Sequence, residues 1–246
     1  MTKKSFGLIG VGAFGTLAAR HLAPHVDLVL YDAGKDVAGL AKEIDARTGD
    51  LKTAASCDIV MLAVPVQKIR QMVQEIAPFV KPDALVLDVA SVKIKPIAAL
   101  LEFLPPGIAI IGTHPLFGPQ SGKNGIKGLN IVLCDIRGGC IDEVEAFCAQ
   151  KLGLKVLRAT PEQHDREAAY VQGLTHLLAK IIISLDLPPM QLTTRTYELM
   201  QQMVDMLRHD SDDLFRAIAR ENPFSREAQE AFFAATRKLD EKLSQK

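Results

Sequence analysis

Two polar side chains follow apolar runs in the middle of the chain. Ser91 follows "ALVLDV" within the string "DVASVK", and His114 follows "IAIIG" within "GTHPLFGP". A histidine titrates close to neutral pH, so His114 can accept a hydroxyl proton while hydride leaves the carbon that carries it. The Ser91 hydroxyl can hydrogen-bond the same substrate oxygen. The alternative needs no chemistry: Ser91 caps a helix and His114 belongs to an ordinary loop.

The stretch "THPLFGPQSGKNG", residues 113–125, has an unusual composition for a segment that follows a buried strand. It contains three glycines and two prolines and few large apolar side chains. One interpretation is a loop whose backbone closely approaches a bound substrate, and the other is a surface crossover. We expect the first, an active-site loop.

A glycine-rich string opens the chain. "GLIGVGAFGTLAAR" places Gly10, Gly12 and Gly15 between an apolar run and a helix-length stretch, with Phe14 in the same loop. Such glycines let the backbone turn tightly and let a pyrophosphate bind at the helix N-terminus. Glycine spacing alone is a weak signal, but its place between a strand and a helix predicts a dinucleotide-binding loop.

An acidic residue follows the second apolar run. Asp32 lies 22 residues after Gly10, where a carboxylate can bind the ribose hydroxyls of NAD and repel the additional phosphate of NADP. We therefore predict NAD as the cofactor. Lys35 and Lys42 keep NADP as an alternative, and a second alternative is that Asp32 merely begins the turn "DAGKD".

The first part of the chain alternates apolar runs with helix-length stretches. Strands are predicted at 5–10, 27–32, 57–64, 84–89, 108–112, 130–134 and 155–159. Several of these runs are apolar throughout, which is typical of parallel strands covered on both faces. We predict an α/β fold with a Rossmann-like, doubly wound, mainly parallel sheet in a dinucleotide-binding domain of residues 1–159.

The pattern changes at Thr160. Beyond it we predict only helices, at about 161–186, 190–208, 211–221 and 225–243. These form an all-helical domain of residues 160–246 for substrate binding and dimerisation. Because so short a helical segment is small for a core of its own, we expect a homodimer through this domain.

Composition and charge exclude several classes of protein. Twenty-nine basic residues balance 29 acidic ones, which argues against nucleic acid as a partner. The longest apolar run, "LLAKIIISLDL", is too short and too charged to span a membrane, and the N-terminus lacks the features of a signal peptide. The cysteines and histidines show no metal-ligand spacing. We expect a cytoplasmic protein with a small-molecule substrate and no metal.

The strings "DVASVK", "GTHPLFGPQSG" and "EQHDREAAYVQGLTH" resemble the prephenate and arogenate dehydrogenase family of tyrosine biosynthesis, in the same order and over nearly the whole chain. The resemblance implies an NAD(P)-dependent oxidative decarboxylation of a cyclohexadienol. The ring carbon bearing the hydroxyl gives hydride to the nicotinamide, His114 takes the hydroxyl proton, and loss of carbon dioxide aromatises the ring. Ser91 is implied to bridge the substrate hydroxyl and the cofactor, and the family implies a dimer.

The resemblance also implies substrate-binding residues in the helical domain. Gln172 and His176 share one helix face, and the family places them close to the substrate. A structural alternative makes this face a polar stripe that packs against the first domain. Members that use prephenate commonly carry an arginine on the next long helix, where this chain has Glu198. Arg195, nearly one turn away, is the candidate substitute.

The string "HDSDDLF" resembles the acidic segment of arogenate-preferring members, with Asp210 as the candidate reader. A carboxylate would favour the ammonium of arogenate over the keto group of prephenate. The expected reaction is therefore arogenate to tyrosine, with prephenate to 4-hydroxyphenylpyruvate as the alternative. The acidic cluster can equally serve as the cap and first turn of a helix that begins near Ser211.

Two rival functions stay open at this point. A dehydrogenase acting on β-hydroxy acids would place a catalytic lysine in the helical domain, and the inner candidate is Lys180. A non-catalytic sensor would bind NAD without reducing it. That rival leaves Ser91, His114 and Gln172 without a chemical reason to occur together.

Overall fold

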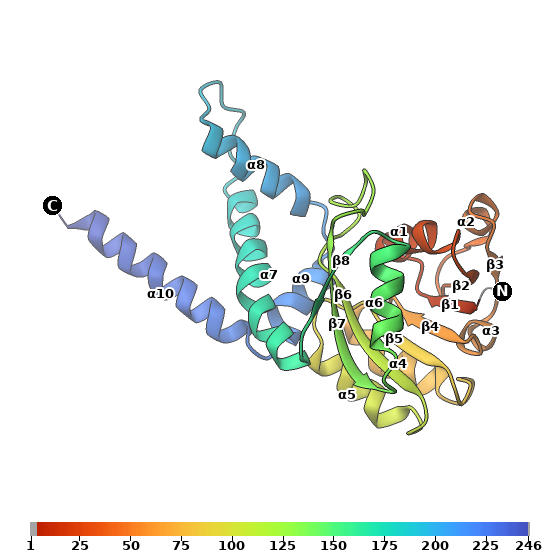
Figure 1. The fold of residues 1–246 in the computed structure, drawn as a ribbon. Coiled ribbons are helices and arrows are strands. Elements are labelled where there is room, and N and C mark those ends of the chain that lie inside the picture. Colours follow the sequence, from red (N-terminus) through yellow and green to blue (C-terminus); the bar gives the residue numbers. More distant parts are fainter. Residues whose placement is uncertain (1–3, 246) are drawn as a thin grey trace. The chain divides into compact units, whose positions relative to one another are not determined.

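The computed structural model describes residues 4–245, which form a sheet with its helices followed by a set of helices (Figure 1). The chain divides into two compact units between Glu162 and Gln163. The first unit holds all the strands, and the second is helical. The predicted fold class is confirmed. The functions predicted for the two domains stay predictions.

The sheet has eight strands in the described part of the chain. They are β1 (Ser5–Ile9), β2 (Asp27–Tyr31), β3 (Arg47–Thr48), β4 (Ile59–Leu62), β5 (Leu85–Asp88), β6 (Ala109–Pro115), β7 (Asn130–Arg137) and β8 (Lys155–Arg158). Their order is β3-β2-β1-β4-β5-β6-β7-β8, and every pair is parallel except β6 with β7. The strand order reverses between β1 and β4, which is where doubly wound sheets bind ligands at their carboxyl ends.

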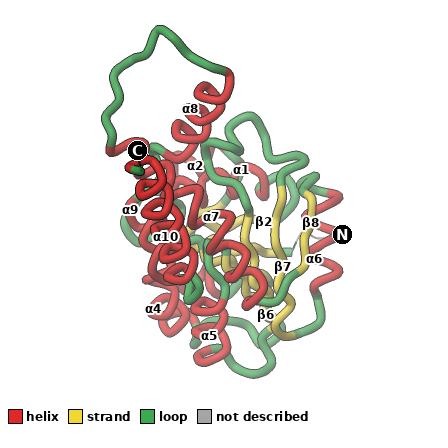
Figure 2. The backbone as a smooth tube through the Cα atoms, turned by 90° about the vertical axis from the view of Figure 1, so that its left-hand side faces the viewer, coloured by secondary structure: helices red, strands yellow, loops and turns green. Residues whose placement is uncertain are grey.

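Helices cover both faces of this sheet. The helices of the first unit are α1 (Ala13–Leu22), α2 (Ala38–Glu43), α3 (Leu51–Ala55), α4 (Val66–Ile76), α5 (Ile94–Phe103) and α6 (Ile141–Gln150). Side chains of α1 and α6 belong to one apolar cluster, and those of α3, α4 and α5 belong to another. On β1, Leu8 joins the first cluster and Ile9 the second, as the alternation along a strand requires. Figure 2 shows strands between α4 and α5 on one side and α6 on the other.

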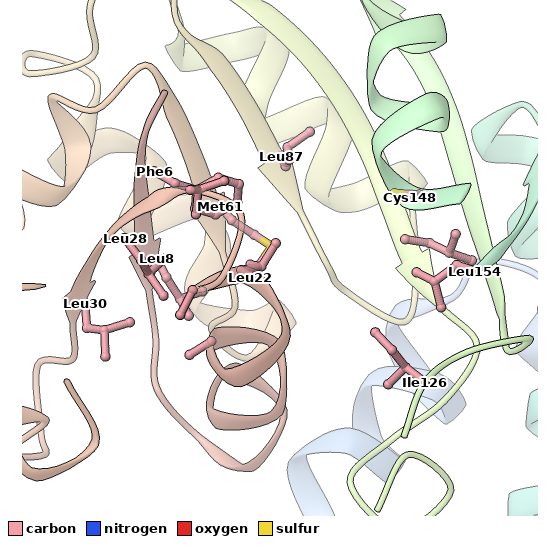
Figure 3. Close-up of a cluster of buried hydrophobic side chains, with 14 of the residues drawn as sticks. Phe6, Leu8, Leu22, Leu28, Leu30, Met61, Leu87, Ile126, Cys148 and Leu154 are labelled. Atoms are coloured by element: carbon pink, nitrogen blue, oxygen red, sulfur yellow. The ribbon is translucent and has the colours of Figure 1, made fainter. Parts of the chain in front are cut away.

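The cluster on the α1 side of the sheet surrounds a cavity of about 820 Å³. Figure 3 shows side chains of this cluster in two groups, one around Leu22 and Met61 and the other around Cys148 and Leu154. All four of these residues line the cavity. Its walls come from α1, from α6 and from the face of the sheet that these helices cover, whereas α4 and α5 pack in the opposite cluster.

The second unit contains the remaining helices. They are α7 (Pro161–Ser184), α8 (Arg195–Leu207), α9 (Asp212–Arg216), the π-helix η1 (Ala217–Glu221) and α10 (Ser225–Ser244). Pro161 occupies the first position of α7, where its missing N–H costs no hydrogen bond. Among the helices of residues 4–245, none combines the length and the apolar character needed to span a lipid bilayer.

Several predicted boundaries differ from the structure. β3 was not predicted, because its two residues are exposed and carry no apolar signal. The strand predicted at 108–112 continues to Pro115, so His114 lies within β6 and pairs with Val132 of β7. The helix predicted at 190–208 begins only at Arg195, because the Thr194 hydroxyl caps it by accepting from the Tyr197 N–H at 3.2 Å. The helix predicted at 211–221 is divided into α9 and η1.

Candidate active site

The glycine loop after β1 has a backbone that only glycine permits. Gly10 has a φ of +98°, and a Cβ at this position would lie 2.6 Å from the Ala63 carbonyl oxygen. A Cβ at Gly15 would lie 2.1 Å from the Gly10 carbonyl oxygen, because α1 packs directly on the loop. The loop is therefore held tightly on the side that faces the protein.

Gly12 lies on the open side of the same loop. It is the N-cap of α1, and a Cβ built there would have no heavy atom within 4 Å. The first N–H groups of a helix have no partner within the helix and favour an anion. A pyrophosphate approaching at Gly12 would meet free space and these N–H groups. The loop therefore fits a dinucleotide, because the absence of a side chain at Gly12 leaves space for the pyrophosphate.

Asp32 joins this loop to the end of β2. The Val11 N–H donates to Asp32 Oδ2 at 2.7 Å, and the Gly34 N–H donates to Oδ1 at 2.9 Å. The second bond is the turn that the structural alternative expects. The first bond, however, holds the carboxylate against the glycine loop, where a ribose would lie in a dinucleotide-binding fold.

The loop that follows His114 packs against α1. The Phe117 ring lies 6.3 Å from that of Phe14, measured between centroids, and Ile126 is buried in the cluster on the α1 side. A Cβ at Gly122 would lie 3.0 Å from Leu17 Cδ2. The loop is therefore attached to the helix that begins at the glycine loop, which joins the two predicted functional segments.

Ser91 and His114 lie at the carboxyl ends of the neighbouring strands β5 and β6. Their exposed fractions are 7% and 4%. The Ser91 hydroxyl is buried and has no hydrogen-bond partner within residues 4–245. Buried polar groups nearly always have a partner, so an orphaned hydroxyl at this edge indicates a place where a ligand completes the bonding.

A buried ion pair lies beside these two residues. The Lys93 ammonium pairs with the Asp88 carboxylate, and both side chains have no exposed surface. The same ammonium donates to the Thr113 carbonyl oxygen at 2.6 Å. Lys93 is not among the site residues predicted from the sequence, although a lysine between Val92 and Ile94 in "SVKI" is a signal of an unusual environment.

The large apolar cavity lies next to this site but does not contain its polar groups. Ser91, His114, Gly10 and Asp32 do not line it, whereas Phe14 and the two neighbours of His114, Thr113 and Pro115, do. A binding site needs convergent polar groups in addition to apolar walls. We therefore locate the candidate site at the strand ends and not in the cavity.

In the second unit, the structure brings three predicted residues together. His176 is buried, its Nδ1 lies 2.9 Å from the Gln172 carbonyl oxygen, and its Nε2 lies 3.1 Å from Asp210 Oδ2. Both ring nitrogens thus lie within hydrogen-bond distance of an acceptor oxygen. The buried side-chain oxygen of Gln172 has no partner in the described part of the chain.

The acidic segment divides between two roles. Ser211, not Asp210, caps α9, because its hydroxyl accepts from the Leu214 N–H at 3.2 Å. Asp212 and Asp213 occupy the first turn of α9, where negative charge is favourable. The helix-capping alternative therefore accounts for Ser211, Asp212 and Asp213. It does not account for Asp210, which pairs with His176.

Two other candidates are engaged elsewhere. The Arg195 side chain is 72% exposed, and its guanidinium lies 3.3 Å from Glu198. It makes no hydrogen bond to the Gln172, His176 and Asp210 cluster. The Lys180 ammonium lies 3.5 Å from Asp212 and stacks on the Phe215 ring, which gives this lysine a structural role within the helices.

The cysteines carry no reactive signature. None of the four forms a disulfide bond within residues 4–245, and burial raises the pKa of Cys148 to about 12, so this thiol stays protonated at neutral pH. Within residues 4–245, no group of three or more His, Cys, Asp or Glu side chains is arranged to hold a metal ion.

Comparison with known proteins gives a consistent result. Residues 16–137 match the family model described as "Prephenate dehydrogenase, nucleotide-binding domain". The chain is 28% identical over 253 residues to "Arogenate dehydrogenase 1, chloroplastic" of Arabidopsis thaliana. The matched region covers 98% of this chain and 39% of that protein. It is 28% identical over 213 residues to "Probable arogenate/prephenate dehydrogenase" of Methanocaldococcus jannaschii, which covers 82% of this chain and 47% of that protein. The chain thus spans less than half the length of these two relatives.

Solved structures share the fold. The crystal structure of prephenate dehydrogenase from A. aeolicus in complex with hydroxyphenyl propionate and NAD+ gives a TM-score of 0.77 at 21% identity, over 98% of this chain and 91% of that one. Synechocystis arogenate dehydrogenase gives a TM-score of 0.70 at 19% identity, over 96% of this chain and 90% of that one. At these identities the likeness concerns the fold.

The open space at Gly12 leads to a first prediction. The substitution Gly12→Ala places a methyl group where no protein atom lies, so we expect an unchanged melting temperature. Dinucleotide binding should weaken by roughly tenfold or more, as expected for a steric clash of about 1–3 kcal/mol. Calorimetric titration with NAD+ measures it. Gly39→Ala, which also meets open space, is the matched control, and equal affinity in both variants would contradict the assignment.

Proposed function

Because this chain belongs to the prephenate dehydrogenase family through its nucleotide-binding domain at residues 16–137, we propose that it catalyses the NAD-dependent oxidative decarboxylation of arogenate to tyrosine. The observation that carries the proposal is the orphaned, buried Ser91 hydroxyl at the sheet edge that also holds the buried His114. Conversion of prephenate to 4-hydroxyphenylpyruvate is the second candidate reaction. The names of the relatives include both arogenate and prephenate dehydrogenases, which supports either substrate.

The chemistry assigns separate tasks to His114 and Ser91. Ser91 donates its hydroxyl proton in a hydrogen bond to the substrate hydroxyl oxygen and orients it. His114 accepts the hydroxyl proton as the carbon–hydrogen bond breaks. The carbon–carboxylate bond then breaks, its electron pair enters the ring, and carbon dioxide leaves. His114 returns the proton to the resulting phenolate oxygen, so the protein ends in the protonation state in which it began.

The cofactor is a nicotinamide dinucleotide, which when bound supplies the ring that accepts the hydride. Gly10, Gly12 and Gly15 would hold its pyrophosphate, and Phe14 contributes to the same loop. Asp32 supports NAD over NADP, because its carboxylate is held at the glycine loop and would repel a 2′-phosphate.

The proposed reader of the substrate side chain is the cluster of Gln172, His176 and Asp210. A carboxylate in this cluster favours arogenate, whose ammonium it attracts. The pairing with His176 holds Asp210 in one place and supports this role. Arg195 would serve as the anchor for prephenate, but its exposure and its pairing with Glu198 give that role less support.

The second unit also supports the proposal of a homodimer. Val171 and Leu178 on α7 and Leu185, directly after its last residue, are spaced seven residues apart, and all three are exposed. Further large apolar side chains are exposed on the neighbouring helices, namely Leu199, Met206, Phe233, Leu239 and Leu243. Exposed apolar surface of this kind marks an interaction site.

The role of His114 can be tested by its removal. We expect His114→Ala to bind NAD+ normally and to lose turnover by roughly 100- to 10,000-fold, the usual contribution of a placed general base. Formation of reduced nicotinamide, followed by absorbance, measures turnover. His25→Ala, a half-buried histidine of the same unit, serves as the control. Near-normal turnover of the His114 variant would rule this residue out as the base.

Substrate preference tests Asp210. The substitution Asp210→Asn should lower the ratio of the two kcat/KM values, arogenate over prephenate, on the order of fivefold to tenfold, as expected for about 1 kcal/mol of ion pairing. Asp213→Asn, in the first turn of α9, should leave the ratio as it is. If both variants keep the wild-type ratio, Asp210 does not read the substrate.

The oligomeric state tests the apolar face of α7. Light scattering should give twice the chain mass of 26.8 kDa for the wild type. Val171→Asp places a charge on the exposed face and should yield a monomer. Leu101→Asp, an equally simple change at an exposed residue of α5, should remain dimeric. A monomeric wild type would contradict the proposal.

A further inference from the structure

We propose that Lys93 is a positioning residue, whose buried ammonium holds the main chain of β6 so that His114 faces the substrate. The inference rests on the proposed function, because it concerns the geometry of the proposed base. Lys93 does not touch the reacting atoms in this account. It acts through the Thr113 carbonyl, which belongs to the peptide bond that joins Thr113 to His114.

Several contacts connect the two strand ends. The Lys93 ammonium pairs with Asp88 and donates to the Thr113 carbonyl oxygen at 2.6 Å. The Thr113 hydroxyl in turn donates to the Asp88 carbonyl oxygen at 2.6 Å. The Ala90 N–H donates to Asp88 Oδ2 at 3.0 Å. The end of β5 and the residue before His114 are therefore linked in both directions.

The link occurs where backbone pairing between the two strands has stopped. The parallel pairing of β5 with β6 ends at Asp88 and Gly112. Beyond it, Thr113 and His114 pair with Leu133 and Val132 of β7. On the β5 side of this segment, the Lys93 side chain therefore supplies the donor for the Thr113 carbonyl oxygen.

Gly112 leaves the space that the lysine requires. A Cβ at Gly112 would lie 3.3 Å from Lys93 Cδ and 2.9 Å from Ile97 Cδ1. The lysine stem therefore crosses β6 at the residue two positions before His114. This approach is possible because Gly112 has no side chain.

The same residue also connects to Ser91. Lys93 is the N-cap residue of α5, and Ser91 lies two positions earlier in the turn between β5 and this helix. A displacement of the ammonium would therefore move both proposed functional segments. An apolar side chain of similar volume could fill the space without the cost of burying a charge, but it could not donate to the Thr113 carbonyl.

The test compares Lys93→Met, the double variant Lys93→Met/Asp88→Asn, and Lys95→Met as a control on the exposed side of the same helix. Lys93→Met leaves a buried carboxylate without its cation and is expected to be less stable. The double variant removes both charges and keeps an acceptor for the Ala90 N–H, so its melting temperature should approach that of the wild type. Neither variant can hold the Thr113 carbonyl.

We expect kcat of the double variant to remain roughly tenfold to 100-fold below the wild type, the order known for a small misplacement of a catalytic group. The substrate KM and the NAD+ affinity should change less than about threefold, well under the 1.4 kcal/mol that a tenfold change represents. Lys95→Met should match the wild type. Recovery of kcat together with stability in the double variant would overturn the proposal, because the ion pair would then be purely structural.

A second readout does not depend on activity. The imidazole resonances of His114, assigned by their loss in His114→Ala, should shift and broaden in the double variant and stay unchanged in Lys95→Met. Unchanged resonances in the folded double variant would overturn the positioning role. A wild type that binds NAD+ and turns over neither substrate would overturn the proposed function, while the resonances would still decide whether Lys93 positions His114.

Discussion

In the proposed mechanism, the carboxyl ends of β5 and β6 have to hold a serine and a histidine in a fixed relation beyond Asp88 and Gly112, the last backbone pair of the two strands. The protein meets this constraint with a lysine and an aspartate that have no exposed surface. Burying two charges costs several kcal/mol for each ion and is offset only where the remaining donors and acceptors are satisfied. The Thr113 carbonyl and the Ala90 N–H supply such partners. The geometry of the candidate site depends on this junction, because His114 follows Thr113 directly and Ser91 follows Ala90.

The remaining parts of the first unit connect to this junction through the sheet. The glycine loop after β1 lies at the strand-order reversal, and Asp32 ties it to the end of β2. The loop after His114 returns to α1 through the ring contact of Phe14 and Phe117. The dinucleotide loop and the strand end that carries the proposed base therefore belong to one packed body. In the second unit, the contact of His176 with Asp210 joins α7 to the segment between α8 and α9.

The sequence predicted the architecture well where burial leaves a local signal. Strands covered on both faces appear as apolar runs, so all seven predicted strands are present, whereas the two exposed residues of β3 gave no signal. The extension of β6 through His114 depends on antiparallel pairing with β7, which is remote in sequence. The role of Lys93 depends on a glycine and a carbonyl contributed by another strand. Such contacts between strands depend on tertiary packing, and the string "DVASVK" alone does not predict them. Ser91 and His114, by contrast, were predicted from their positions after apolar runs, the family resemblance added their roles, and those roles stay proposals.

The most direct test of the account is a paired assay with the purified wild-type protein. Reduced nicotinamide would be followed with L-arogenate and with prephenate, while the aromatic product and carbon dioxide are identified by mass spectrometry. The account predicts reduction of NAD+ coupled one-to-one to release of carbon dioxide, with a higher kcat/KM for arogenate. Binding of NAD+ without reduction by either substrate would contradict it and would indicate a nucleotide-binding sensor.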